Sequence, residues 1–408
     1  MGLTIEGTAV VLLLVAAVVA IVSQRVRLPY SVGLVIAGIV LSLLPFTPQI
    51  RLTRELLFDT LLPPLIFEAA LSLHWSELRR DLAVVVALAT VGVAISAVIT
   101  AAGMHAFAHL PWLSAVIFGI LIAATDPVSV IAVFREARLE GRLRLLVESE
   151  SLFNDGTAAV GFAIAVSFVG GAPVTGSAVL SSALITIAGG LACGALVAGI
   201  SLVFVGRTQD HLVELTLTTV AAYGSFILAE HFHASGVLAT LTAGLLMGNV
   251  GRLRVLSERG KIAVTAFWEF AAFLANSLIF LLIGMQQARL NLRDAGIGVL
   301  LAIGFVALGR AGAVYPTCLL FARSSLRVTG RHQHVLFWGG LRGGLALALA
   351  LALPQQLPFR AEIITFSFAV VAFSIFVQAL TMRPFLRALG EIPRRHGQDA
   401  HVRPAAVE

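Results

Sequence analysis

Long apolar runs recur from one end of this 408-residue chain to the other, and they constrain its fold more than any other feature. A helix of about 20 apolar residues crosses a hydrocarbon core about 30 Å thick. Only 12% of the residues are charged, against about 25% in an ordinary soluble domain. Charged, proline and glycine clusters divide the chain into thirteen predicted spans: 6–22, 29–45, 55–73, 82–104, 112–134, 145–169, 177–205, 213–230, 236–250, 262–287, 295–321, 333–353 and 361–386. The sequence therefore predicts an all-α polytopic membrane protein with about thirteen transmembrane helices.

The basic residues lie mainly in alternate loops between these spans. Of the 28 Lys and Arg residues, sixteen fall in odd-numbered loops, five in even-numbered loops and five after the last span. Because loops rich in Lys and Arg stay on the cytoplasmic side, we expect the N-terminus outside and the C-terminus inside the cell (inner) membrane. The net charge of +6 then reflects orientation in a lipid bilayer, and we expect no nucleic-acid partner.

Charged side chains also fall inside the predicted spans. The carboxylates are those of Glu68, Asp126, Glu150 and Asp155, and the guanidiniums are those of Arg310 and Arg342. A charge in the middle of a bilayer is unfavourable unless it is paired or hydrated. Because the carboxylates outnumber the guanidiniums, we expect at least one carboxylate to be protonated or to bind a cation.

Two of the predicted spans carry helix-breaking residues near their middle. In span five, Pro127 removes a backbone N–H and disfavours helix at Asp126, the residue before it. In span twelve, the string GGLRGG at 339–344 places four poor helix formers together. If span seven (177–205) is a linker, spans five and twelve are each fifth in a half of six helices. Interrupted helices at corresponding positions predict two inverted six-helix repeats with crossing broken helices and a site at the midplane.

The string ESLFNDG at 150–156 in span six carries the most distinctive set of polar side chains. On a helix, Ser151 and Asp155 share one face, and Glu150 and Asn154 share a neighbouring one. Their oxygens are hard ligands suited to an alkali cation. A buried carboxylate is neutralised by a proton or by a cation, but not by both. That competition predicts coupled exchange with no cofactor and no enzymatic step. The rival from another class is a cation channel, which would show a conductance.

These motifs resemble those of the monovalent cation:proton antiporter superfamily, in particular its NhaP-like bacterial sodium/proton antiporters and animal sodium/proton exchangers. The matching strings are LPPLIFEA at 62–69, TDP at 125–127, ESLFNDG at 150–156 and GGLRGG at 339–344, and the match spans roughly 5–388. The resemblance implies an electroneutral sodium/proton antiporter that works by alternating access of the elevator type. Potassium/proton exchange on the same fold is the closest alternative.

The resemblance also implies residue roles. Asp155 would hold the cation and the proton in turn, and the side chains that complete or support this monovalent-cation site would be Thr125, Ser151 and Asp126. Asn154 would stand where electrogenic relatives carry a second aspartate. The candidate cation- and proton-binding set consists of Asp155, Asp126, Ser151, Thr125, Asn154 and Glu68.

A structural ion pair is implied beside this set. Glu150 would pair with Arg310 or with Arg342, and the sequence leaves the choice open. Asn276 departs from the animal exchangers, which carry a glutamate at the corresponding position.

At the level of domains, the resemblance implies a homodimer. Residues 1–390 would form one transmembrane transporter unit, followed by a short cytoplasmic tail at 391–408. Within the unit, spans 4–6 and 11–13 would form a mobile core, and spans 1–3 and 7–10 would form the dimer scaffold. The expected partners are the sodium ion, the proton, the bilayer and a second copy of the chain.

Overall fold

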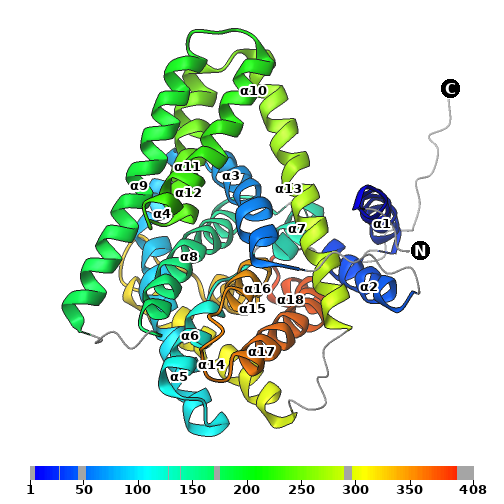
Figure 1. The fold of residues 1–408 in the computed structure, drawn as a ribbon, viewed down its shortest axis with the longest axis vertical. Helices are drawn as coiled ribbons and strands as arrows, with labels where there is room; N and C mark the ends of the chain where they lie inside the picture. Colours follow the sequence, from blue (N-terminus) through cyan, green and yellow to red (C-terminus); the bar gives the residue numbers. More distant parts are fainter. Residues whose placement is uncertain are drawn as a thin grey trace, which may run out of the picture.

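The computed structural model describes residues 5–26, 28–44, 52–126, 128–137, 139–169, 175–288 and 296–392, and every regular element in these ranges is helical (Figure 1). The first half contains α1 (Ile5–Val26), α2 (Tyr30–Leu43), η1 (Leu56–Leu61), α3 (Leu62–Ser72), α4 (Trp75–Ala87), η2 (Leu88–Gly92), α5 (Val93–Ala108), α6 (Trp112–Leu121), α7 (Val128–Ala137) and α8 (Arg142–Ser167). The η elements are single π-helical stretches inside longer helices. The all-α prediction is confirmed for the described residues.

The second half begins with the 30-residue helix α9. It contains α9 (Gly176–Val205), α10 (His211–Thr219), η3 (Val220–Gly224), α11 (Ser225–His231), α12 (Gly236–Leu246), η4 (Met247–Val255), α13 (Glu258–Gln287), α14 (Gly296–Leu320), α15 (Gly330–Trp338), α16 (Gly344–Leu351), α17 (Arg360–Phe373), η5 (Ser374–Ala379) and α18 (Leu380–Leu389). Each of the thirteen predicted spans overlies one helical element or a run of two or three consecutive ones within the described residues.

Several helices are long and apolar enough to cross a membrane. Among the described residues there are seven: Gly7–Val26, Trp75–Ala108, Gly176–Val205, His211–His231, Glu258–Gln287, Gly296–Leu320 and Arg360–Leu389. Three shorter apolar helices are Tyr30–Leu43, Trp112–Leu121 and Gly236–Gly251. The two spans predicted to be interrupted are indeed divided, into α6 with α7 and α15 with α16.

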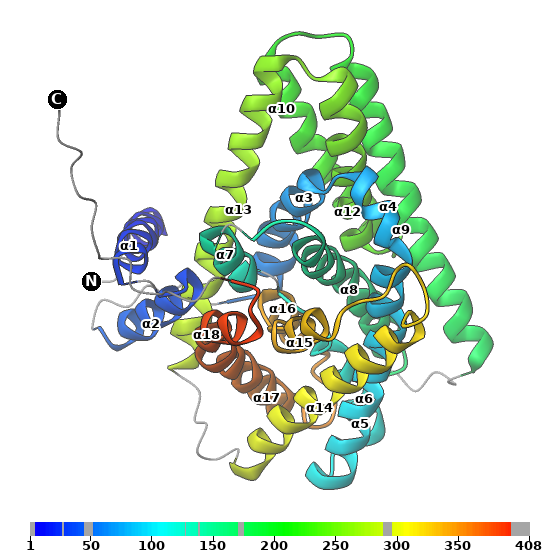
Figure 2. The same cartoon turned by 180° about the vertical axis from the view of Figure 1, so that it is seen from behind.

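The helices differ in which neighbours they pack against. In one set, α5 packs along α14 and α6, α8 along α6 and α4, and α14 also along α17. In another set, α13 packs along α2 and α3, and α12 along α3 and α9. Figures 1 and 2 show α9, α10 and the first part of α13 projecting together at one end of the molecule, while α14 and α17 lie at the other.

Helix α13, which forms one wall of the site described below, is held tightly against α2. At Gly38 a β-carbon would overlap the carbonyl oxygen of Leu281, and at Gly284 one would overlap the carbonyl oxygen of Val35. The two backbones are therefore in direct contact, which only glycine permits at these positions. Nearby, the Tyr30 hydroxyl shares a 2.7 Å hydrogen bond with the hydroxyl of Ser277 on α13.

Candidate cation-binding site

The two interrupted helices cross. Non-helical segments at 122–126 and 339–343 separate α6 from α7 and α15 from α16. The Asp126 N–H donates to the Leu341 carbonyl at 2.8 Å, so the two segments are joined backbone to backbone. Pro127, the predicted helix breaker of span five, lies outside the described residues.

Arg342 occupies the end of the broken helix α6. Its guanidinium is 2% exposed and donates to the carbonyls of Ala123 at 2.5 Å and Ala124 at 3.0 Å. A helix that stops leaves its last carbonyls without donors, and a positive charge there is also favoured by the helix dipole. Arg342 therefore stabilises the interruption that positions Thr125 and Asp126.

Gly343 leaves room for the Asp126 side chain at this crossing. A β-carbon at Gly343 would overlap the Oδ2, Cγ and Cβ atoms of Asp126. The φ angle of Gly343 is −142°, which any residue can adopt. The requirement for glycine is thus one of space between the two crossing segments.

Helix α8 binds the crossing through two polar side chains, those of Asn154 and Ser151. The Asn154 side chain accepts from the Thr125 N–H at 3.1 Å and donates to the Thr125 hydroxyl at 2.6 Å. It also donates to Glu150 Oε1 at 3.0 Å. Ser151 donates its hydroxyl proton to the Thr125 carbonyl. The backbone of Thr125 is thereby fixed against one face of α8.

Glu150 forms its ion pair with Arg310. The two guanidinium nitrogens of Arg310 donate to the two carboxylate oxygens at 2.7 and 3.0 Å, and the side chains are 8% and 2% exposed. Arg310 also donates to the Leu336 carbonyl at 3.2 and 2.8 Å. The choice that the sequence left open falls on Arg310. The Arg342 guanidinium, the other alternative, donates to the carbonyls of Ala123 and Ala124.

A cavity of about 700 Å³ leads to Asp155. Its lining includes Gln24 and Ser72, near the ends of α1 and α3, and Glu148, in the second turn of α8. Along α8 its lining runs from Glu148 to Asp155, and along α13 from Glu269 to Ile279. Most of the wall is apolar.

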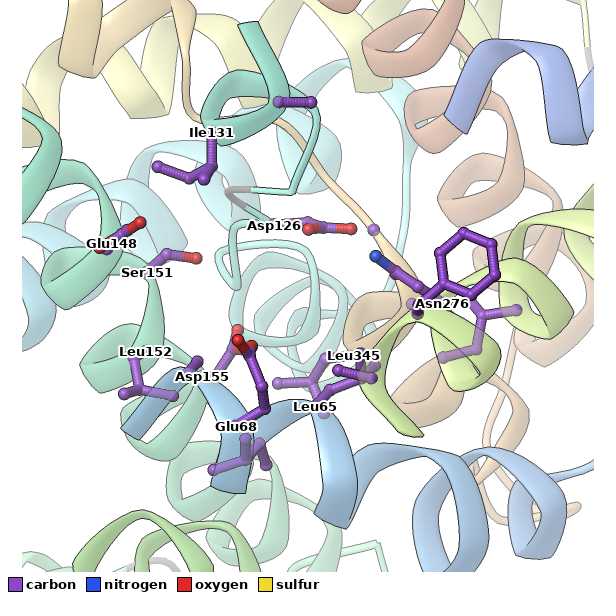
Figure 3. A pocket seen from close by; sticks show the side chains of 18 of the residues that line it. Leu65, Glu68, Asp126, Ile131, Glu148, Ser151, Leu152, Asp155, Asn276 and Leu345 are labelled. Carbon is purple, nitrogen blue, oxygen red and sulfur yellow. The ribbon is translucent and has the colours of Figure 1, made fainter. Parts of the chain in front are cut away.

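Polar side chains from three elements meet in the cavity. Figure 3 shows Glu68 from α3, Asp126 from the crossing, and Ser151 and Asp155 from α8 directed into the same space. Oδ1 of Asp155 is buried and has no hydrogen-bond partner among the described residues. The Asp155 carboxylate is close enough to Asp126, Glu150 and Arg342 to interact with each electrostatically. A cation or a proton in this place would satisfy an oxygen that the described protein atoms leave unbonded.

The predicted site residues fall into two layers. Those that line the cavity are Glu68, Thr125, Asp126, Ser151 and Asp155. The side chains of Asn154, Glu150 and Arg310 lie behind this lining and bond to one another and to Thr125. Asn154 is 0% exposed, and among the described residues it is not part of the cavity wall.

Two acidic residues of the wall were missed in the sequence. Glu148 lies one and two turns before Ser151 and Asp155, on the same face of α8, and its helical spacing could have revealed it. It pairs with Arg144 at 2.9 Å. Glu269 belongs to α13, whose approach to α8 no local pattern indicates.

Comparisons with known proteins agree with this geometry. The family model "Sodium/hydrogen exchanger, transmembrane" matches residues 10–388. The Na(+)/H(+) antiporter ApNhaP of Aphanothece halophytica is 38% identical over 389 residues, which is 94% of this chain and 74% of that protein. The Na(+)/H(+) antiporter NhaH of Halobacillus aidingensis is 32% identical over 392 residues, covering 93% and 96% of the two chains.

The fold also has a solved counterpart. The structure of the sodium proton antiporter MjNhaP1 from Methanocaldococcus jannaschii at pH 8 superimposes with a TM-score of 0.76 at 20% identity, covering 94% of this chain and 98% of the other. At that identity the likeness establishes the fold. Together with the family match over 10–388, it shows that this chain belongs to the sodium/hydrogen exchanger family.

Proposed function

We propose that this protein exchanges Na⁺ for H⁺ across a membrane and that Asp155 carries the two ions in turn. The observation that supports this most directly is the buried Asp155 Oδ1, which lies at the inner end of a cavity and lacks a hydrogen-bond partner among the described residues. The chain is 32–38% identical to proteins named Na(+)/H(+) antiporters, which supports Na⁺ and H⁺ as the two transported ions. This function needs neither an organic cofactor nor an enzymatic step.

The coupling follows from the surroundings of Asp155. An ionised carboxylate in a medium of low dielectric is strongly disfavoured unless a positive charge neutralises it. A proton or a cation can do so, but they compete for the same oxygens. When Asp155 holds neither a proton nor a cation, the protein therefore changes poorly between its two access states. This suppresses ion movement that is not coupled to exchange. With one exchanging carboxylate, one charge moves in each direction and the cycle is electroneutral.

The second layer supports a single exchanging carboxylate. Glu150 is neutralised by the bidentate contact with Arg310, and Asn154 is a neutral amide whose hydrogen bonds go to Glu150 and Thr125. The Ser151 hydroxyl donates a hydrogen bond to the Thr125 carbonyl, so the lone pairs of its oxygen remain available to a cation. Asp126, Thr125 and Ser151 would then complete the shell around Na⁺, with Glu68 at its edge.

Alternating access is proposed to move one set of helices against the other. The core would consist of α4–α8 and α14–α18, and the scaffold of α1–α3 and α9–α13; the packing within each set supports this division. We further propose that the scaffold forms a homodimer in the cell membrane. Its N-terminus would lie outside, and the residues after 390 would form a cytoplasmic tail.

The function is tested with purified protein in proteoliposomes that carry an internal pH indicator. A sodium gradient is expected to drive proton movement in the wild type, and Asp155→Asn is expected to abolish it while expression and melting temperature stay near normal. Asp210→Asn, at a 58% exposed side chain, is the matched control and should behave like the wild type.

Near-normal exchange in Asp155→Asn would refute the assignment of that residue. Gradients of Li⁺ and K⁺ run in the same vesicles decide selectivity, because oxygen ligands alone do not set ion radius. Exchange driven only by K⁺ would replace the proposal with potassium/proton antiport. An ionic conductance without proton coupling would replace it with a channel.

A further inference from the structure

The cavity is closed beyond Asp155 by the second half of α13. The residues from Ile279 to Met285 are all buried. Each is at most 3% exposed, apart from Gly284, which is buried and has no side chain. The cavity reaches Ile279 and includes no residue of α13 beyond it. Each residue advances a helix by about 1.5 Å, so the end of α13 lies roughly 12 Å past the inner end of the cavity. This buried segment separates the cavity from the C-terminal end of α13, and it is called the seal below.

Gln287, the last residue of α13, makes a polar contact at this seal. Its Nε2 donates to the backbone carbonyl of Phe368 at 2.5 Å, and the Gln287 residue is 7% exposed. Phe368 is fully buried within α17. Figures 1 and 2 both show this end of α13 beside α17.

The contact joins the proposed scaffold to the proposed core. Helix α13 packs on α2 and α3, whereas α17 packs on α14 and α16. Two other close approaches between the sets are apolar: Gly156 on α8 meets the tip of Leu238 on α12, and Gly344 meets that of Ile279 on α13. A second polar contact, from the Trp75 N–H on α4 to the Asn249 side chain on η4, lies where the chain passes from scaffold to core. Apolar side-chain tips can slide past one another, but a buried hydrogen bond between a side chain and a carbonyl has one register.

We infer that Gln287 sets the balance between the two access states by bonding to the Phe368 carbonyl only while its side of the protein is closed. When the closed side opens, the core must move relative to α13 and this hydrogen bond breaks. The inference rests on the proposed antiport function. Gln287 touches neither ion, and it acts on transport by positioning α17 against α13.

The expected effect is specific to one side of the membrane. A neutral buried hydrogen bond changes an equilibrium constant by roughly two- to tenfold. Apparent affinity on a given side is the intrinsic affinity reduced by the fraction of molecules open to that side. Loss of the bond therefore raises the population open at the Gln287 side. Apparent Na⁺ affinity should rise there and should stay level or fall at the side of Gln24 and Ser72.

The test uses Gln287→Met, which keeps the length of the side chain and removes its donor. Gln286→Met, at the half-buried neighbouring residue, is the matched control. The concentration of Na⁺ that gives half-maximal exchange is measured from each side in vesicles of known orientation. We expect it to fall two- to tenfold on the Gln287 side in Gln287→Met only. Equal shifts on both sides, or no shift, would overturn the inference.

A second readout does not depend on transport. In a background without Cys193 and Cys318, Asn276→Cys places a thiol in the cavity wall. A membrane-impermeant thiol reagent added at the open side should label this cysteine more slowly when Gln287→Met is also present. Unchanged labelling in a folded protein would contradict the inference. If the Asn276→Cys protein labels at the open side but the wild type moves no protons with Na⁺, the proposed function is refuted instead.

Discussion

At the scale of single residues, Glu150 and Asp155 are both carboxylates on α8, but Glu150 is paired with Arg310 and serves the structure. The side chains of Glu150 and Arg310 are both buried, and the pair makes two direct hydrogen bonds. Removing one member of a buried ion pair leaves the other charge uncompensated, which typically costs about 3–5 kcal/mol. Asp155, by contrast, has an oxygen without a partner among the described residues, so its neutralisation should matter for transport more than for folding.

This difference predicts the outcome of a double-mutant cycle at the pair. Arg310→Met should lower the melting temperature in detergent because Glu150 loses its guanidinium partner, and Glu150→Gln should lower it as well because the charge of Arg310 is left uncompensated. The combination Arg310→Met with Glu150→Gln should recover much of the stability lost in Arg310→Met alone. Additive losses in the double variant would show that the two side chains do not act as a pair.

At the scale of elements, the crossing of the two interrupted helices depends on how closely the non-helical segments approach. Gly343 lies against Asp126 so closely that one extra carbon would overlap it. The hydrogen bond from Asp126 to Leu341 and the contacts of Arg342 with α6 keep the two segments from moving apart. Added volume at Gly343 is therefore expected to displace the Asp126 carboxylate.

We predict that Gly343→Ala lowers the rate of sodium-driven proton movement by roughly tenfold or more, because small displacements at a working site have large effects on rate. Gly304→Ala on α14 is the control, since a β-carbon there meets nothing within 4 Å. Both variants should insert and purify normally. Wild-type rates in Gly343→Ala would mean that the position of Asp126 is not critical.

At the scale of the whole molecule, the proposed cycle requires the core to move against the scaffold. The contact between Gly156 on α8 and Leu238 on α12 lies on this boundary, because the Leu238 side chain occupies the space next to Gly156. The contact between Gly224 in η3 and Val197 on α9 lies inside the scaffold, with Val197 Cγ1 at 3.4 Å from a β-carbon built at Gly224. In both pairs a β-carbon placed at the glycine lies within 3.4 Å of a side-chain carbon of its neighbour.

In a background without native cysteines, oxidation of the Gly156→Cys, Leu238→Cys pair should stop exchange, and reduction should restore it. The same treatment of the Gly224→Cys, Val197→Cys pair should leave exchange running, because no movement is expected within the scaffold. Proteoliposome assays before and after oxidation measure both. Full exchange in the oxidised Gly156–Leu238 pair would argue against relative movement at this boundary.

Local physics determined much of this protein from the sequence alone. The length of the apolar runs identified the chain as a polytopic membrane protein. Proline and glycine identified where two helices are interrupted, because their effect on the backbone acts within a few residues. Helical spacing also placed Ser151 and Asp155 on one face of α8.

Only the tertiary structure decided which groups meet. Glu150 and Arg310 are 160 positions apart, and no local rule distinguishes Arg310 from Arg342 as the partner. Asn154 belongs to the second layer because its side-chain amide is hydrogen-bonded to Thr125, which lies on another element. Because α13 passes the cavity and then α17, Glu269 lines the cavity and Gln287 bonds to α17. Such contacts depend on how whole helices pack, and that is a property of the folded chain.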